Sequence, residues 1–182
     1  MNLEQLKQDI SVEFPSFKLV SKADSRFMKT IDIGLRIITF NQMKEFMTSF
    51  VTTIGTTIYT STEWETQPTT SKISILRHER VHMQQARRLG SVWYGILYLL
   101  VWFPAVFAVY RTKFEQEAYE ESMRSDVESY GVEVLDDEKY RGNMIRHFTS
   151  AEYFWMCPFR GRVERWYDEA ASQIRAAHEL RR

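Results

Sequence analysis

The sequence predicts a mainly helical α+β domain with a short sheet. Apolar residues recur every three to four positions in most segments, which is the period of an amphipathic helix. One segment, 51–60, is instead dominated by β-branched residues and loses that period. The length of 182 residues suits one compact domain. We therefore expect a single domain over 1–182, with a core at about 50–130 and helical additions at both ends.

Local stop signals delimit the predicted elements. Gly90 and Gly131 each follow a long stretch of helical spacing, and glycine is the preferred residue just beyond the end of a helix. The polar segment 62–70 contains Pro68 and predicts a loop. In chain order the predicted elements are helix 2–14, helix 25–38, strand 51–60, helix 71–89, helix 105–130, helix 138–148 and helix 162–180.

Charge and cysteine content exclude some function classes. Lys plus Arg and Asp plus Glu both total 24, so the formal net charge is zero and no nucleic-acid partner is expected. The single cysteine, Cys157, cannot form an internal disulfide, and the polar N-terminus lacks the features of a secretory signal peptide. These observations favour a cytoplasmic protein.

A metal-binding pattern lies within the predicted helix 71–89. His78 and His82 are four residues apart, so both rings project from one face of the helix and can reach one zinc ion. Glu79 follows the first histidine and lies beside the metal, where a carboxylate can accept a proton from water. The arginines of this helix fall on the opposite side, so the motif belongs to the inward face. The alternative is a pair of histidines that bind no metal.

A catalytic zinc ion usually has a third protein ligand, and an acidic run on the next helix offers one. On a helical projection Glu117 and Glu121 share the face of Phe114, whereas Glu115 and Glu120 lie beside charged or polar residues. We therefore expect Glu117 to bind the metal. Glu121, one turn further on, could accept a hydrogen bond from a ligand histidine and orient it. The alternative is a solvated acidic helix face.

These two motifs together resemble the gluzincins, the thermolysin-like branch of the zinc metallopeptidases. The match consists of His78-Glu79-Arg80-Val81-His82 and the later Glu117-Ala118-Tyr119-Glu120-Glu121, and the order of strand, motif helix and glutamate helix is also similar. The surroundings of the first motif are similar to small metallopeptidases predicted in bacteria and their phages. The resemblance implies His78, His82 and Glu117 as zinc ligands, Glu79 as general base, and a strand that lines the substrate cleft. It covers about residues 50–125.

The chain departs from that family in one respect. The thermolysin-type residues that stabilise the tetrahedral intermediate are not identifiable in the sequence. His147 and Tyr153 are the candidates for this role, and a purely structural role for each is the alternative.

The stretch 92–110 is apolar and carries no charge over 19 residues, about the length of a membrane span. A span would place His82 and Glu117 on opposite sides of the bilayer, so they could not share a metal. Pro104 interrupts any helix here. We favour a buried core helix or hairpin, with attachment to a membrane surface and a true span as alternatives.

The sequence thus predicts a zinc-dependent hydrolase, specifically a metallopeptidase that cleaves a peptide or protein substrate by metal-activated water. The alternative is a catalytically silent protein that zinc stabilises, for example a structural or interaction component of a virion. The first hypothesis implies Zn²⁺ as cofactor and the cytoplasm as location, or a virion if the gene belongs to a phage.

Overall fold

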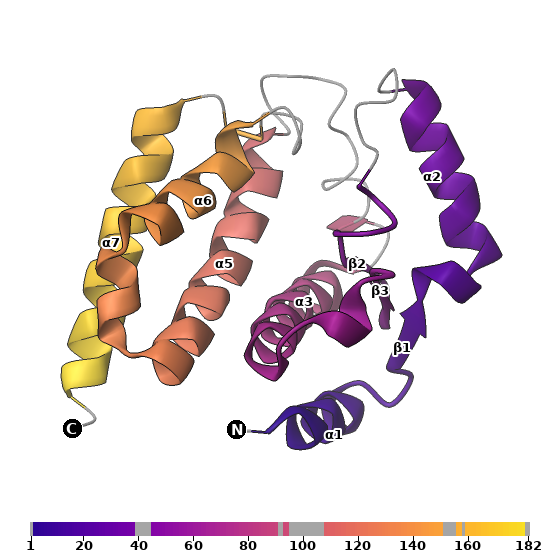
Figure 1. Cartoon of the computed structure of the whole chain (residues 1–182), viewed down its shortest axis with the longest axis horizontal. Coiled ribbons are helices and arrows are strands. Elements are labelled where there is room, and N and C mark those ends of the chain that lie inside the picture. Colours follow the sequence, from indigo (N-terminus) through magenta and orange to yellow (C-terminus); the bar gives the residue numbers. More distant parts are fainter. Residues whose placement is uncertain are drawn as a thin grey trace. The chain divides into compact units, whose positions relative to one another are not determined.

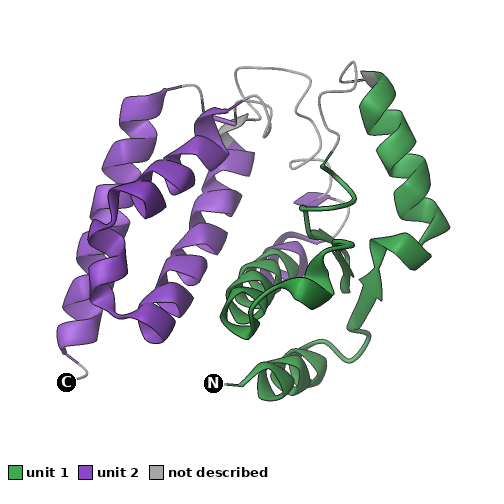
Figure 2. Ribbon diagram, viewed as in Figure 1, with its two compact units in different colours: residues 1–83 green, residues 84–182 purple. Residues whose placement is uncertain are grey.

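The computed structural model describes residues 2–38, 45–90, 93–94, 108–150, 156–157 and 159–180. Its residues group into two compact units, Met1–Met83 and Gln84–Arg182 (Figure 2). Six α-helices and a three-stranded sheet lie within the described residues, so the prediction of a mainly helical α+β fold with a short sheet is confirmed (Figure 1).

The first unit contains the sheet. Its elements in chain order are α1 (Leu3–Glu13), β1 (Lys18–Ser21), the 3₁₀ turn η1 (Lys22–Asp24), α2 (Arg26–Ile38), β2 (Thr52–Ile54), β3 (Thr57–Thr60), η2 (Trp64–Thr66) and most of α3 (Thr69–Leu89). The boundary between the two units falls inside α3, so this one continuous helix belongs to both.

The sheet differs from the sequence prediction. The single strand expected at 51–60 is a hairpin, because Gly55 adopts a φ of 60° and turns the chain between β2 and β3. The strand order is β1-β3-β2, with β1 parallel and β2 antiparallel to β3. The sequence did not indicate β1, since a strand of four residues is too short to establish a period.

The core of the first unit joins α1, the sheet and α3. Leu6 and Ile10 of α1 pack in one apolar cluster with Ile58 of β3 and Leu76 of α3, and all four are fully buried. Burial of each such side chain stabilises the fold by about 1.5–3 kcal/mol. This packing holds the hairpin against the side of α3 on which Glu79 lies.

The second unit is helical in its described part. After the C-terminal end of α3 it contains α5 (Ala108–Tyr130), the 3₁₀ turn η3 (Val132–Asp136), α6 (Glu138–Thr149) and α7 (Arg160–Glu179). Gly90 and Gly131 follow α3 and α5 with φ values of 83° and 90°, which confirms both predicted stops. Residues 105–107, where the sequence placed the start of the fifth helix, lie outside the described residues.

No helix in the described ranges combines the length and the apolarity that a bilayer span requires. Most of the apolar stretch 92–110 lies outside those ranges, since only residues 93–94 and 108–110 of it are described. The interpretation of this stretch as a buried core helix or hairpin stays a prediction.

Candidate metal centre

Helix α3 holds the motif histidines in contact with each other. The Nε2 atoms of His78 and His82 lie 3.1 Å apart, and their ring centroids are 4.8 Å apart with the planes nearly perpendicular. His82 is 5% exposed, and His78 is partly buried. The i, i+4 spacing on one continuous helix therefore places both rings as the sequence predicts.

This separation suits a shared metal ion. Two imidazole nitrogens bound to one tetrahedral ion at 2.0–2.1 Å lie about 3.3 Å from each other. The observed 3.1 Å is close to that value. The rings present the correct spacing of nitrogen atoms without any rearrangement of the helix.

A third residue joins this pair. His78, His82 and Glu115 form a group that could hold a metal ion, because one ligand atom from each lies within 4.8 Å of the others. Glu115 is 6% exposed. A buried carboxylate is costly to desolvate unless a cation or hydrogen-bond donors compensate it. Two imidazoles and one carboxylate are also a common ligand set of catalytic zinc sites.

The acidic member of this group is Glu115, whereas the helical-face argument favoured Glu117. The Oε2 atom of Glu117 instead accepts hydrogen bonds from Gln85 Nε2 at 3.0 Å and from Arg88 Nη2 at 3.1 Å. Its side chain is 48% exposed. Glu117 therefore forms a surface ion pair with Arg88 and a hydrogen bond with Gln85, both in the C-terminal part of α3.

The composition of the buried face explains this difference. The projection identifies the inward face of the helix by Phe114, an apolar residue that is indeed buried, and passes over the small and polar residues. The buried face of α5 contains Glu115 and three small residues, Ala118, Ser122 and Ser125, at helical spacing from it. Such a stripe of small residues is typical of a face that packs closely against another element, and it is a signal in the sequence from which Glu115 could have been found.

The predicted orienting residue Glu121 is 26% exposed at its side chain and forms an ion pair of 3.5 Å with Arg124. Its hydrogen bond to a ligand histidine stays a prediction. Its neighbour Glu120 binds Trp166, whose Nε1 lies 3.1 Å from the carboxylate. The acidic residues of α5 thus contact different partners.

Glu79 is buried and accepts a hydrogen bond from the sheet. It is 7% exposed, and the Thr53 hydroxyl on β2 donates a hydrogen bond of 2.6 Å to its Oε2 atom. A second charged residue, Lys22, is fully buried in the same unit and interacts electrostatically with both Glu79 and Asp32. Burial lowers the pKa of Lys22 to about 7, although these two carboxylates act in the opposite direction. Neither Thr53 nor Lys22 was identified from the sequence, because both depend on how the sheet packs.

The structure assigns no catalytic position to the two candidates for stabilising an intermediate. His147 lies on α6 and stacks on the ring of Tyr119, with centroids 5.2 Å apart. Tyr153 lies outside the described residues. Their proposed roles stay predictions.

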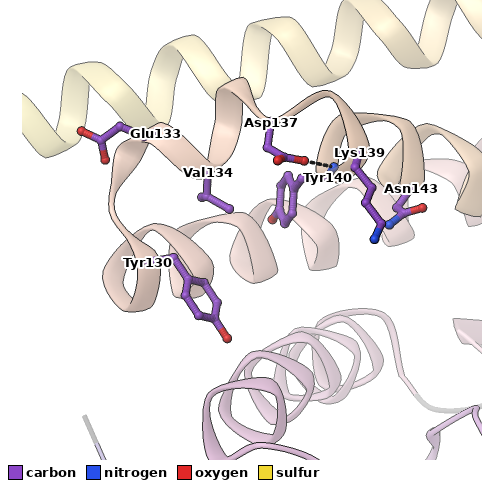
Figure 3. A pocket seen from close by; sticks show the side chains of 7 residues that line it. All are labelled: Tyr130, Glu133, Val134, Asp137, Lys139, Tyr140 and Asn143. Carbon is purple, nitrogen blue, oxygen red and sulfur yellow. Dashed lines mark hydrogen bonds between the residues drawn. The ribbon is translucent and has the colours of Figure 1, made fainter.

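A separate pocket of about 500 Å³ lies in the second unit, and no motif residue lines it (Figure 3). Tyr140 at its edge donates a hydrogen bond of 2.8 Å to Asp126, and burial followed by the charge of Asp126 raises the pKa of Tyr140. Asp137 caps α6 by accepting from the Tyr140 backbone N–H. Tyr140 and Asp137 therefore already serve the fold. The pocket is lined by Tyr130, Glu133, Val134, Asp137, Lys139, Tyr140 and Asn143.

Comparison of the chain with protein-family models, with curated proteins and with solved structures yields no match. Function is therefore inferred from the geometry of the site itself.

Proposed function

We propose that the protein is a zinc-dependent hydrolase that cleaves peptide bonds. The observation that supports this most directly is the group of His78, His82 and Glu115, with Glu79 directly beside the first histidine in the chain. Three protein ligands leave the fourth position of a tetrahedral zinc ion open, which distinguishes a catalytic zinc site from a structural one with four protein ligands. When bound, zinc would supply Lewis acidity and lower the pKa of water.

Glu79 would act as the general base. Its carboxylate accepts a proton from the attacking water while the water oxygen bonds to the scissile carbonyl carbon. The same carboxyl group then returns that proton to the leaving nitrogen as the C–N bond breaks. Burial of Glu79 supports this role, since a base screened from bulk water keeps the transferred proton within the site.

Metal analysis of the purified full-length chain tests the ligand assignment. We expect about one zinc ion per chain, and we expect both His78→Ala and His82→Ala to lose it. His178→Ala on α7 is the matched control, since this histidine is distant in sequence and outside the proposed ligand group. Full zinc content in both motif variants would contradict the metal centre.

The variant Glu79→Gln separates an enzyme from a silent zinc protein. Glutamine has nearly the same shape but cannot accept the proton, so we expect zinc content and melting temperature to be retained while hydrolysis is lost by at least about 100-fold. The substrates are a library of quenched-fluorescence peptides and dye-labelled casein. A wild type that binds zinc but cleaves none of them would favour the structural alternative.

A further inference from the structure

The hydrogen bond between Thr53 and Glu79 follows from the packing of the sheet on α3. Thr53 lies opposite Ile58 in the antiparallel register of β2 and β3, and side chains directly opposite each other point to the same face of a sheet. Ile58 is fully buried in the cluster that contains Ile73 and Leu76 of α3. Thr53 therefore faces α3, one to two helical turns beyond these residues, where Glu79 lies.

The contact is short and involves a charged acceptor. The Thr53 Oγ1 to Glu79 Oε2 distance is 2.6 Å, within the range of hydrogen bonds from a hydroxyl to a carboxylate. Such bonds are about twice as strong as those between neutral groups. Because Glu79 is only 7% exposed, water cannot easily replace the hydroxyl. Thr53 thus restrains the rotation of the Glu79 carboxylate.

The bond also distinguishes the two oxygens of Glu79. The hydroxyl proton of Thr53 lies against Oε2, which leaves Oε1 better placed to accept a further proton. We propose that Thr53 is a positioning residue that orients Glu79 so that Oε1 accepts the proton during peptide hydrolysis. This inference rests on the proposed function, and it adds a residue on the sheet to the site on α3.

The neighbouring residue Thr52 provides a matched control. It lies on the same strand opposite Tyr59, so its side chain points to the other face of the sheet. Valine has nearly the shape of threonine and suits a strand equally well, so Thr53→Val removes the hydroxyl with little change in strand propensity. Thr53→Ser keeps the hydroxyl and removes only a methyl group.

The kinetic test uses one peptide that the wild type cleaves. We expect Thr53→Val to lower kcat by about 10- to 100-fold with KM and zinc content unchanged, because a misplaced base slows the chemical step and leaves substrate binding intact. Thr53→Ser should restore kcat to within about threefold, and Thr52→Val should behave as wild type. If Thr53 had a purely structural role, Thr53→Val would lower stability but would not lower kcat at an unchanged KM.

A second measurement tests the contact without reference to activity. Urea unfolding of Thr53→Val, Glu79→Ala and the double variant forms a double-mutant cycle. We expect the double variant to have a midpoint above the one that additive effects would give, since each single change already removes the shared hydrogen bond. Additive midpoints would overturn the contact itself.

The outcomes separate this inference from the proposed function. A normal kcat in Thr53→Val, together with loss of hydrolysis in Glu79→Gln, would overturn the role of Thr53 and leave the hydrolase intact. Full activity in Glu79→Gln, or no hydrolysis by the zinc-loaded wild type, would overturn both. A low kcat in both Thr53→Val and Thr53→Ser would show that the methyl group matters instead of the hydroxyl, and would also overturn the inference.

Discussion

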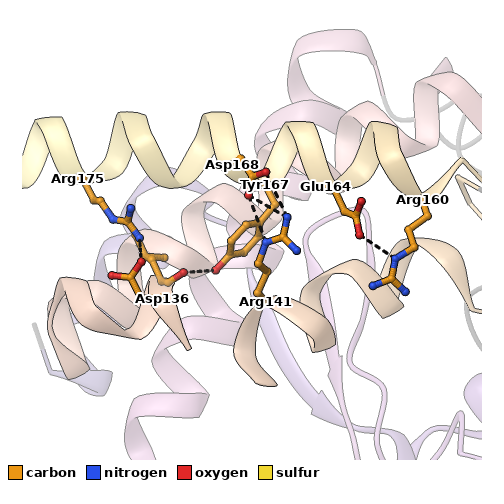
Figure 4. A network of polar contacts seen from close by, with 8 residues as sticks. Asp136, Arg141, Arg160, Glu164, Tyr167, Asp168 and Arg175 are labelled. Atoms are coloured by element: carbon orange, nitrogen blue, oxygen red, sulfur yellow. Dashed lines mark hydrogen bonds and ion pairs between the residues drawn. The ribbon is translucent and has the colours of Figure 1, made fainter. Parts of the chain in front are cut away.

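The polar residues around the motif on α3 contrast with those along α7. Glu79, Lys22 and His82 are at most 7% exposed, and each makes specific polar contacts. The charged residues of α7 form ion pairs that lie at the surface (Figure 4). Asp168, for example, accepts three hydrogen bonds from Arg141 while its side chain remains 61% exposed.

The difference teaches that burial decides how strongly a polar contact affects the protein. Exposed ion pairs gain little because water solvates the separated charges almost as well. Buried polar groups depend on their partners, so they persist only where the fold or the chemistry requires them. Each buried contact around α3 therefore has a larger energetic consequence than an exposed ion pair of α7.

The largest predicted effect is the change in stability with pH that the buried Lys22 should cause. Its ammonium group donates to the carbonyl oxygens of Phe46 and Phe50 at 2.7 and 2.9 Å and lies 3.7 Å above the Phe46 ring. Because its folded-state pKa is lowered from 10.5 to about 7, the unfolded chain binds more protons between these values, and stability rises with pH across that window. The free energy of unfolding should rise by about 3 to 4 kcal/mol between pH 7 and pH 10 through this group, at about 1.4 kcal/mol per pH unit at most.

Urea unfolding across this pH range measures the effect as a difference between the wild type and Lys22→Met, which lacks the titrating group. Lys18→Met is the control, since Lys18 is an exposed lysine on the adjacent strand β1. If the free energy of unfolding changed equally with pH in the wild type and in Lys22→Met, protonation of the buried ammonium group would not be coupled to folding. Lys22 would then not differ in energy from the exposed charges of α7.

The next largest effect should be the loss of zinc affinity when Glu115, and not Glu117, is replaced. Glu115 is buried in the candidate metal group, whereas Glu117 is half exposed, so we expect Glu115→Ala to weaken zinc binding by more than about 100-fold and Glu117→Ala by less than about 10-fold. Glu121→Ala should lie between them, at about 10-fold, if it orients a ligand histidine. Competition with a chromophoric chelator measures each affinity. A larger loss in Glu117→Ala than in Glu115→Ala would support Glu117 as the ligand, as the sequence predicts.

The helices and the histidine pair could be predicted from the sequence because local rules determine them. Glycines at helix ends mark where α3 and α5 stop, and the i, i+4 spacing alone brings His78 and His82 together. The hairpin was not recognised, because Gly55 lies inside a run of β-branched residues that reads as one strand.

The remaining site residues depend on tertiary packing. Thr53 reaches Glu79 only because β2 pairs with β3 in a register that turns it toward α3. Glu115 and Glu117 lie two positions apart on α5, which is a rotation of about 200° around the helix. The projection identifies the side of the large apolar residues, but it does not show which carboxylate tertiary packing buries.

Removal of a buried hydrogen bond in the second unit should have an effect smaller than that of Lys22 and larger than that of an exposed ion pair. The Tyr167 hydroxyl on α7 donates to the carbonyl oxygen of Leu135 at 3.0 Å, and Tyr167 is 1% exposed. Tyr167→Phe should lower the free energy of unfolding by about 1 to 2 kcal/mol, since it leaves a buried carbonyl without its donor. Tyr130→Phe, at a residue 57% exposed, is the control and should have no measurable effect. A loss below the error of urea unfolding would indicate that water replaces the hydroxyl.

The smallest effect should come from the exposed ion pair of α6 and α7. Asp168→Asn keeps the shape of the side chain and removes the charge that binds Arg141, so it tests the electrostatic term alone. Because Asp168 is 61% exposed, solvent screening should limit the loss to about 0 to 1 kcal/mol despite the three hydrogen bonds, and added salt should reduce it further. Urea unfolding at low and high salt measures both quantities. A salt-independent loss above that of Tyr167→Phe would mean that this pair is shielded from solvent, and the contrast between buried and exposed polar contacts would then fail in the second unit.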